Sequence, residues 1–122
     1  MNEVQRILSA LGALRVPAQP EEYEIHNEIA RALENAGIEF IHECKLLPGR
    51  RIDFACGRIG IEVKKSRPAA ARLREQLKRY LEETELDGII VVMQKPCALP
   101  KTICNKPVYT VALNRLWGVA LH

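Results

Sequence analysis

The 122-residue sequence lacks a long apolar run, a close pair of cysteines and a large excess of charge of one sign. Its longest strongly apolar stretch, residues 88–93, is far shorter than the about 20 residues that a membrane-spanning helix needs. Residues 1–6 show no basic start followed by an apolar run and a small-residue cleavage site, so no signal peptide is evident. We therefore expect a cytoplasmic protein with no membrane partner.

The cysteines are too widely spaced for a familiar metal motif. The nearest two, Cys97 and Cys104, are separated by six residues, whereas structural zinc usually takes at least one close pair such as C-x2-C. Disulfides are rare in intracellular proteins. We therefore interpret Cys44, Cys56, Cys97 and Cys104 as ordinary thiols, with a zinc or iron–sulfur cluster as the alternative.

Composition and length indicate one folded domain. Apolar residues make up 48% and charged residues 27%, close to the averages for soluble domains, which excludes disordered, collagen-like and disulfide-scaffold classes. The chain holds no internal repeat and no low-complexity stretch. At this length there is room for one core only, so any activity must lie on a single small fold.

Charge is concentrated in one part of the sequence. Residues 50–79 contain ten Lys and Arg against three Asp and Glu, a net charge of +7, whereas the rest contains eight against twelve, a net charge of −4. Such asymmetry indicates a region that faces a polyanion while the remainder keeps the protein soluble. The alternative is a solvated charged helix face.

Hydrophobic periodicity predicts an α/β protein. Helices are expected over residues 4–14, 21–36 and 68–83, and strands over residues 40–46, 51–56, 59–64, 88–93 and 108–113. The stretch 88–93 is apolar without alternation, which favours a parallel strand buried on both faces and reached by a helical crossover. A short final element is expected around Leu116, Trp117 and Val119.

Two of these strands should form a hairpin. The dipeptide Gly57-Arg58 suits a two-residue type II′ turn, which favours glycine at its first central position. Counting outward from this turn gives the pairs Cys56–Ile59, Ala55–Gly60, Phe54–Ile61, Asp53–Glu62 and Ile52–Val63. One face is then apolar and includes Ile52. The other should carry the carboxylates, beside small residues at 55 and 60 that would let a phosphate backbone approach.

The polar face of the hairpin carries a candidate catalytic group. Asp53 and Glu62, opposite each other, would repel, and a divalent cation would remove that repulsion. Magnesium is commonly held by one or two carboxylates and several waters, so these two side chains and the Val63 carbonyl predict a partial site. Lys64 projects from the same face and would assist an attacking water. The alternative is an exposed, salt-bridged triplet.

These residues resemble the PD-(D/E)xK nuclease superfamily. Residues 51–54, Arg-Ile-Asp-Phe, look like its first acidic motif, and residues 61–64, Ile-Glu-Val-Lys, look like its E-x-K motif. Residues 76–80 match the Q-x3-Y signature of the RecB-type branch, and the spacing is similar to small stand-alone nucleases such as Holliday junction resolvases. Ile52 replaces the proline of the family name, and Cys97 and Cys104 do not reproduce the iron–sulfur cysteine cluster of some members.

The resemblance implies a restriction-endonuclease-like core of order αβββαβ, with a mixed sheet flanked by helices. The single domain 1–122 would then comprise an accessory helix at 1–16, the nuclease core at 21–93 and a C-terminal extension at 94–122.

The resemblance also implies roles for single residues. The catalytic set would be Asp53, Glu62, Lys64 and Gln76, and the Mg²⁺ or Mn²⁺ ligands Asp53, Glu62, Val63 and His26. For the acid that other branches carry on the first helix, Glu22 is the best match, with Glu24 and Glu28 as alternatives. His26 has an ordinary boundary position as its alternative.

Basic residues beside these motifs and on the helix that follows them would contact nucleic acid. Arg72 and Arg79 flank Gln76 on one side of the predicted helix and would contact phosphates without reading bases. The full set of expected nucleic-acid contacts is Arg51, Lys65, Arg67, Arg72, Arg79 and Tyr80. For Tyr80, core packing is the alternative.

The sequence as a whole therefore predicts a metal-dependent nuclease that hydrolyses phosphodiester bonds in DNA, with RNA left open as a substrate. A homodimer is expected because so small a domain covers few phosphates. One rival is a catalytically weak nucleic-acid-binding subunit of the same fold that acts with a helicase or another partner. A second rival is a protein-interaction role of the amphipathic N-terminal helix. Endonuclease or exonuclease mode, and a role in repair, recombination, phage replication or defence, are left open.

Overall fold

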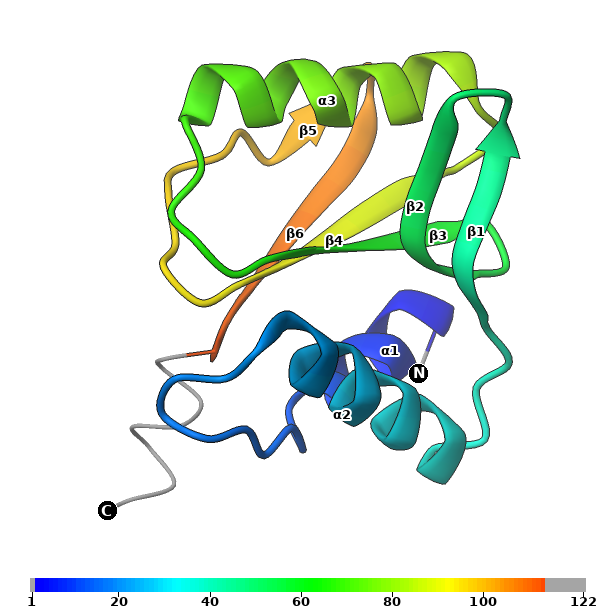
Figure 1. Cartoon of the computed structure of the whole chain (residues 1–122). Coiled ribbons are helices and arrows are strands. Elements are labelled where there is room, and N and C mark those ends of the chain that lie inside the picture. Colours follow the sequence, from blue (N-terminus) through cyan, green and yellow to red (C-terminus); the bar gives the residue numbers. More distant parts are fainter. Residues whose placement is uncertain (1, 114–122) are drawn as a thin grey trace.

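The computed structural model describes residues 2–113 and has three layers (Figure 1). Helix α3 covers one face of a six-stranded sheet, and helices α1 and α2 cover the other. The helices are α1 (Glu3–Leu11), α2 (Glu22–Asn35) and α3 (Ala70–Glu83), and the strands are β1 (Ile41–Leu47), β2 (Arg50–Cys56), β3 (Ile59–Lys64), β4 (Gly88–Met93), β5 (Thr102–Ile103) and β6 (Lys106–Ala112). None of the helices in this described part is long and apolar enough to cross a membrane.

The sheet has the order β1-β2-β3-β4-β6-β5 and mixes both strand directions. Strands β1, β2 and β3 form an antiparallel meander, and β4 pairs parallel to both β3 and β6. The predicted α/β class and the parallel, fully buried strand at 88–93 are confirmed. Strand β5 was not predicted, because two residues are too few to show alternation, and the element expected around Leu116 lies outside the described residues.

Two hydrophobic clusters hold the layers together. On the side of α1 and α2, apolar residues four apart on α2 (Ile25, Ile29 and Leu33) pack on β2, β3 and β4. On the other side, Leu73, Leu77, Tyr80 and Leu81 of α3 pack on the opposite face of the sheet. Strand β3 lies between these clusters, which is why residues 59–63 are all buried. Glu62, the charged residue within this stretch, is therefore buried between the two layers, whereas Lys64 at the end of the strand is partly exposed.

The β2–β3 hairpin follows the predicted register only near its turn. Gly57 has a φ of +59°, as its place in the turn requires, and the pairs from Cys56–Ile59 to Phe54–Ile61 form. The predicted pairs Asp53–Glu62 and Ile52–Val63 are wrong. The Asp53 carboxylate instead accepts a hydrogen bond from the Val63 backbone N–H at 2.7 Å, in place of a backbone partner.

The alternation of side chains along β2 also breaks beside Asp53. Ile52 belongs to the α3 cluster, whereas Phe54 belongs to the α1–α2 cluster, so the two residues do not share a face as predicted. A Cβ on Gly60 would collide with the Ile52 side chain and lie 3.0 Å from that of Leu86. The expected space for a phosphate beside Gly60 is therefore filled by core side chains.

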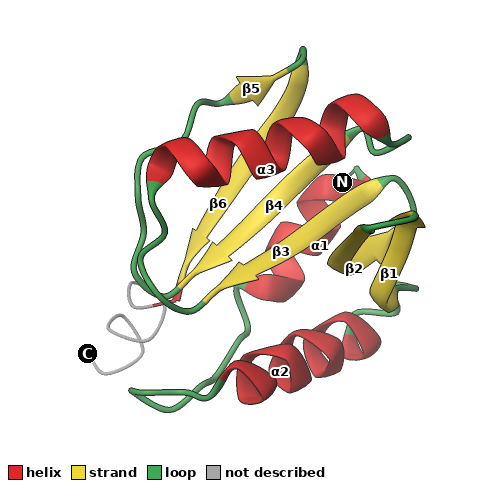
Figure 2. Ribbon diagram, turned by 45° about the horizontal axis from the view of Figure 1, so that its top comes forward, coloured by secondary structure: helices red, strands yellow, loops and turns green. Residues whose placement is uncertain are grey.

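Strand β1 is distorted at the same level. Glu43 has a φ of +52°, a region that side chains other than glycine rarely adopt, and it lies between the pairs His42–Phe54 and Cys44–Ile52. Glu43 is thus opposite Asp53. In Figure 2, β1 and β2 bend away from β3, β4 and β6. The hydrogen bond from Val63 to the Asp53 side chain, the change of face at Ile52 and the positive φ of Glu43 all occur where the pairing of β2 with β3 ends.

Candidate active site

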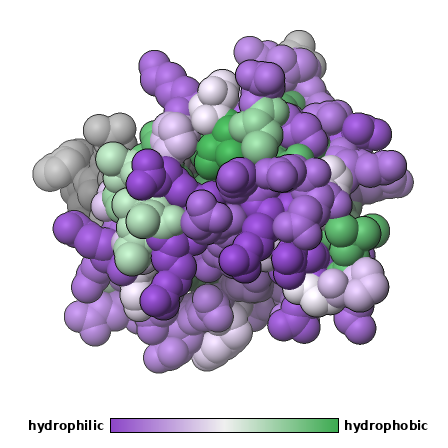
Figure 3. Space-filling view, turned by 90° about the horizontal axis from the view of Figure 1, so that it is seen from above, coloured by the Kyte–Doolittle hydropathy of each residue, from purple (hydrophilic) through white to green (hydrophobic). Residues whose placement is uncertain are grey.

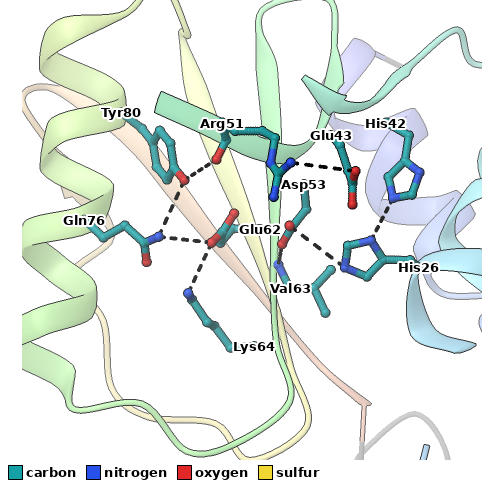
Figure 4. A network of polar contacts seen from close by, with 10 residues as sticks. All are labelled: His26, His42, Glu43, Arg51, Asp53, Glu62, Val63, Lys64, Gln76 and Tyr80. Carbon is teal, nitrogen blue, oxygen red and sulfur yellow. Dashed lines mark hydrogen bonds and ion pairs between the residues drawn. The ribbon is translucent and has the colours of Figure 1, made fainter. Parts of the chain in front are cut away.

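The open end of the β2–β3 hairpin gathers polar side chains from four elements (Figure 4). Asp53 comes from β2, Glu62 and Lys64 from β3, Gln76 from α3 and His26 from α2. All five were predicted as site residues from the sequence. The structure brings them to one place at the edge where β2 separates from β3.

Glu62 is buried and has only one of its two oxygens engaged. Its Oε2 accepts a hydrogen bond from Gln76 Nε2 at 3.2 Å and forms an ion pair with Lys64 Nζ at 3.2 Å. Its Oε1 is buried without a hydrogen-bond partner in the described part of the protein. An unpartnered buried carboxylate oxygen is costly, and a cation is one of the few partners that would satisfy it.

The surroundings of Glu62 disfavour its charge. Burial, followed by the nearby Asp53 carboxylate, raises the pKa of Glu62 to about 7, and the Lys64 ammonium acts in the opposite direction. Perturbed carboxylates of this kind are concentrated at functional sites. The alternative interpretation of Asp53, Glu62 and Lys64 as an exposed, salt-bridged triplet is wrong for Glu62, which is 5% exposed.

Asp53 shows the same division between its two oxygens. Its Oδ2 is fixed by the Val63 N–H, and its Oδ1 faces His26 Nε2 at a distance of 3.9 Å, too long for a hydrogen bond. His26 Nε2 is itself buried without a hydrogen-bond partner among the described residues. Each acid therefore has one oxygen held by a neighbour, and of the two only Glu62 has its other oxygen buried without a partner among the described residues.

A second histidine, which sequence reasoning missed, adjoins the site. His26 Nδ1 and His42 Nε2 are 2.8 Å apart, within hydrogen-bonding distance. The His42 ring is stacked on Phe54, with centroids 4.6 Å apart and an interplanar angle of 18°. The pairing of His42 with Phe54 across β1 and β2 puts His42 one residue from the level of Asp53, a signal that depends on knowing the β1 register.

The structure gives different surroundings to the three candidate acids of α2, the first core helix. The Glu24 side chain accepts a hydrogen bond from the Glu21 backbone N–H and so caps α2, and Glu28 pairs with Arg31 at 3.4 Å. Glu22 is exposed and lines a surface pocket of about 410 Å³ that also includes Val63 and Lys64. Glu22 therefore lies beside the site, without a direct contact to Asp53 or Glu62.

Tyr80 supports the site from the core. It is 5% exposed, and its hydroxyl donates a hydrogen bond to the Arg51 carbonyl at 2.7 Å. Gln76 Nε2 lies 3.5 Å from the same hydroxyl, so the Tyr80 hydroxyl helps to hold the amide that reaches Glu62. Core packing, one of the two alternatives for Tyr80, is confirmed, and the ring does not lie on the surface with the arginines of α3.

The other five predicted nucleic-acid contacts are either exposed or ion-paired. Arg67, Arg72 and Arg79 are exposed, whereas Lys65 pairs with Glu21 at 3.7 Å and Arg51 with Glu43 at 3.9 Å. Figure 3 looks down on α3 and shows a mostly hydrophilic face. Helix α3, which carries Gln76 and the two exposed arginines at 72 and 79, forms one border of the site.

No group of three or more Asp, Glu, His and Cys side chains comes together within residues 2–113, so the groups that could hold a divalent cation here are the two carboxylates and their neighbours. Magnesium needs only one or two carboxylates when substrate and water complete its shell. At about 2.1 Å from an octahedral ion, adjacent donor atoms lie about 3.0 Å apart and opposite ones about 4.2 Å apart, so Asp53 Oδ1 and His26 Nε2, which are 3.9 Å apart, would have to shift to share one ion. The four cysteines are free and lie outside this site.

Comparisons of the chain with protein-family models, with curated proteins and with solved structures found no match.

Proposed function

We propose that the protein is a metal-dependent nuclease that hydrolyses phosphodiester bonds in DNA at the open end of the β2–β3 hairpin. The observation that carries this proposal is that each of the two acids is held in a fixed orientation by a hydrogen bond to one of its oxygens. Asp53 and Glu62 each have one oxygen held by a neighbour, and the Glu62 Oε1 is left buried and free. Two carboxylates held in fixed orientations, one of them with a buried oxygen that lacks a partner among the described residues, would suit a cation site.

Asp53 and Glu62 would hold Mg²⁺ or Mn²⁺, with the Val63 carbonyl and His26 Nε2 as further ligands. When bound, the ion would neutralise charge on the scissile phosphate and acidify the attacking water. The Val63 N–H and Gln76 keep the two carboxylates in fixed orientations, so that they need not reorganise when substrate arrives.

Lys64 has a separate role in this proposal. Its ammonium is 3.2 Å from Glu62 Oε2 and is partly exposed, so it can reach both the acid and a molecule at the surface. It would orient the attacking water and offset the negative charge that develops on phosphorus. Arg72 and Arg79 would hold the nucleic-acid backbone through its phosphates.

The order of the elements adds support to the proposal. The series α2-β1-β2-β3-α3-β4 is a helix, a three-stranded meander, a helix and a strand, the order of a restriction-endonuclease-like core. The residues that resemble the PD-(D/E)xK motifs, on β2 and β3, and the Q-x3-Y residues, on α3, converge at one site.

The proposal is tested by incubating labelled single-stranded, duplex and four-way-junction DNA with purified protein and Mg²⁺, Mn²⁺ or a chelator. We expect cleavage that requires the metal and that falls about a hundredfold or more in Lys64→Ala. Lys101→Ala, which removes an exposed lysine far along the chain from the site, is the matched control and should cleave like the wild type.

Binding of DNA without cleavage in either metal would contradict the proposal and favour the rival function, a binding subunit of the same fold. The same conclusion would follow if cleavage persisted undiminished in Lys64→Ala, because the activity would then belong to a contaminant or to another site.

A further inference from the structure

The contact between His26 and His42 carries an inference that rests on the proposed function and deepens it. His26 Nδ1 and His42 Nε2 are 2.8 Å apart, so one of these nitrogens carries the proton and the other accepts it. His26 is buried, and its Nε2 faces Asp53 Oδ1. Which nitrogen of His26 carries the proton therefore decides what the ring presents to Asp53.

We propose that His42 is a positioning residue that sets the tautomer of His26, so that Nε2 of His26 becomes available to a divalent cation held by Asp53. A histidine that ligates a metal through one nitrogen ordinarily donates the other N–H to a fixed acceptor. His42 Nε2 is the acceptor within reach of His26 Nδ1.

Two neutral arrangements keep this hydrogen bond. In the first, His42 donates from Nε2 and His26 carries its proton on Nε2, toward the Asp53 carboxylate. In the second, His26 donates from Nδ1 and presents the Nε2 lone pair. Both arrangements carry two protons on the pair and no net charge, and they differ in which nitrogen of His26 has a free lone pair.

The surroundings of the two rings hold this contact in place. His42 is exposed, whereas His26 Nε2 is buried and has no hydrogen-bond partner within residues 2–113. Phe54 lies against both rings, with centroids 5.4 Å from His26 and 4.6 Å from His42, and so limits their rotation. The two rings are therefore kept within hydrogen-bonding distance of each other.

The test is the affinity of the purified protein for Mn²⁺ alone, measured by isothermal titration calorimetry. His42→Phe keeps an aromatic ring for stacking on Phe54 and removes the acceptor, and we expect its Mn²⁺ affinity to fall about tenfold or more. His42→Gln replaces the imidazole nitrogen by an amide that can accept or donate, and we expect it to stay close to the wild type. Thermal unfolding without metal checks that both variants are folded.

The variant His26→Ala shows whether His42 acts through His26. In that background, His42→Phe should cause no further loss of Mn²⁺ affinity. Equal affinities of wild type and His42→Phe, or a loss that persists without the His26 ring, would overturn the inference while leaving the metal site in place. Failure of the wild type to bind Mn²⁺ would overturn the proposed function itself, and the inference with it.

Nitrogen-15 NMR of the histidine rings in the unmutated protein supplies a second readout. We expect His26 to carry its proton on Nε2 without metal and on Nδ1 when Mg²⁺ is added. A His26 that keeps its proton on Nε2 in saturating Mg²⁺ would contradict the assignment of His42, whatever the variants show.

Discussion

The two ends of the β2–β3 hairpin differ in how the backbones of the two strands are paired. At the turn end, Gly57 takes the positive φ that its position requires, and three successive pairs form in the register that counting predicts. At the open end, the ladder stops after Phe54–Ile61 and the Asp53 side chain takes the Val63 N–H. The turn end is organised for packing. The open end gives up backbone pairing and brings the carboxylates of Asp53 and Glu62 near each other, which the proposed metal site would explain.

The largest difference between the ends should appear when one acid at each is neutralised. Asp53→Asn keeps an oxygen that can accept the Val63 N–H but removes the charge, and we expect nuclease activity to fall about a thousandfold or more. Asp87→Asn, near the turn, alters an exposed carboxylate paired with Arg58 at 2.8 Å and should leave activity unchanged. Rates of DNA cleavage in Mg²⁺ measure both, and comparable rates in the two variants would remove the functional distinction between the ends.

The turn end should be the more sensitive of the two to added volume. The Cβ of Gly60→Ala would collide with Ile52 and approach Leu86, and we expect a loss of about 1–3 kcal/mol in the free energy of unfolding. Urea denaturation measures this loss. Gly49→Ala is the contrasting variant, because a Cβ there meets nothing within 4 Å although φ is +75°, so any loss comes from backbone strain. A Gly60→Ala protein as stable as the wild type would show that this region repacks freely.

The open end should gain stability when Glu62 loses its charge. Glu62→Gln removes a buried carboxylate beside Asp53, and without metal we expect the free energy of unfolding to rise by about 1 kcal/mol, or a few °C in Tm. Adding Mn²⁺ should reverse the order, since the wild type alone gains stability from binding. Differential scanning calorimetry with and without Mn²⁺ tests this. A Glu62→Gln protein less stable than wild type without metal would mean that Lys64 already satisfies the acid.

The smallest expected effect is on DNA binding, when single arginines of α3 beside the open end are replaced. Arg72→Gln and Arg79→Gln should each weaken DNA binding a few-fold, and each should reduce the slope of log affinity against log salt by about 1, with no change in sequence preference. Arg31→Gln, on the opposite face of the protein and paired with Glu28, is the control. Fluorescence anisotropy across a salt series measures these slopes. An unchanged slope in all three variants would place the DNA on another surface.

The regular parts of the molecule were predictable because local patterns determine them. Alternation, the Gly57 turn and the apolar run at 88–93 predicted the bounds of β3 and β4 and the parallel direction of β4. The Gly57 turn also placed Asp53, Glu62 and Lys64 toward one end of the hairpin, although the predicted Asp53–Glu62 pair does not form.

The rest depends on departures that no period of two or 3.6 residues contains. The positive φ of Glu43, the transfer of Ile52 to the α3 cluster and the use of a side chain in place of a backbone partner at Asp53 are outcomes of packing between layers. The role of His42 depends in turn on the register of β1. Sequence patterns could therefore name most of the site residues but could not describe the opening that makes them a site.

The most direct test of the account is anomalous diffraction from crystals of the protein grown with Mn²⁺. We expect an anomalous peak in contact with the carboxylates of both Asp53 and Glu62, and its loss in crystals of Asp53→Asn. A strong peak elsewhere, or none at saturating Mn²⁺, would contradict the claim that the open end of the hairpin is a metal site.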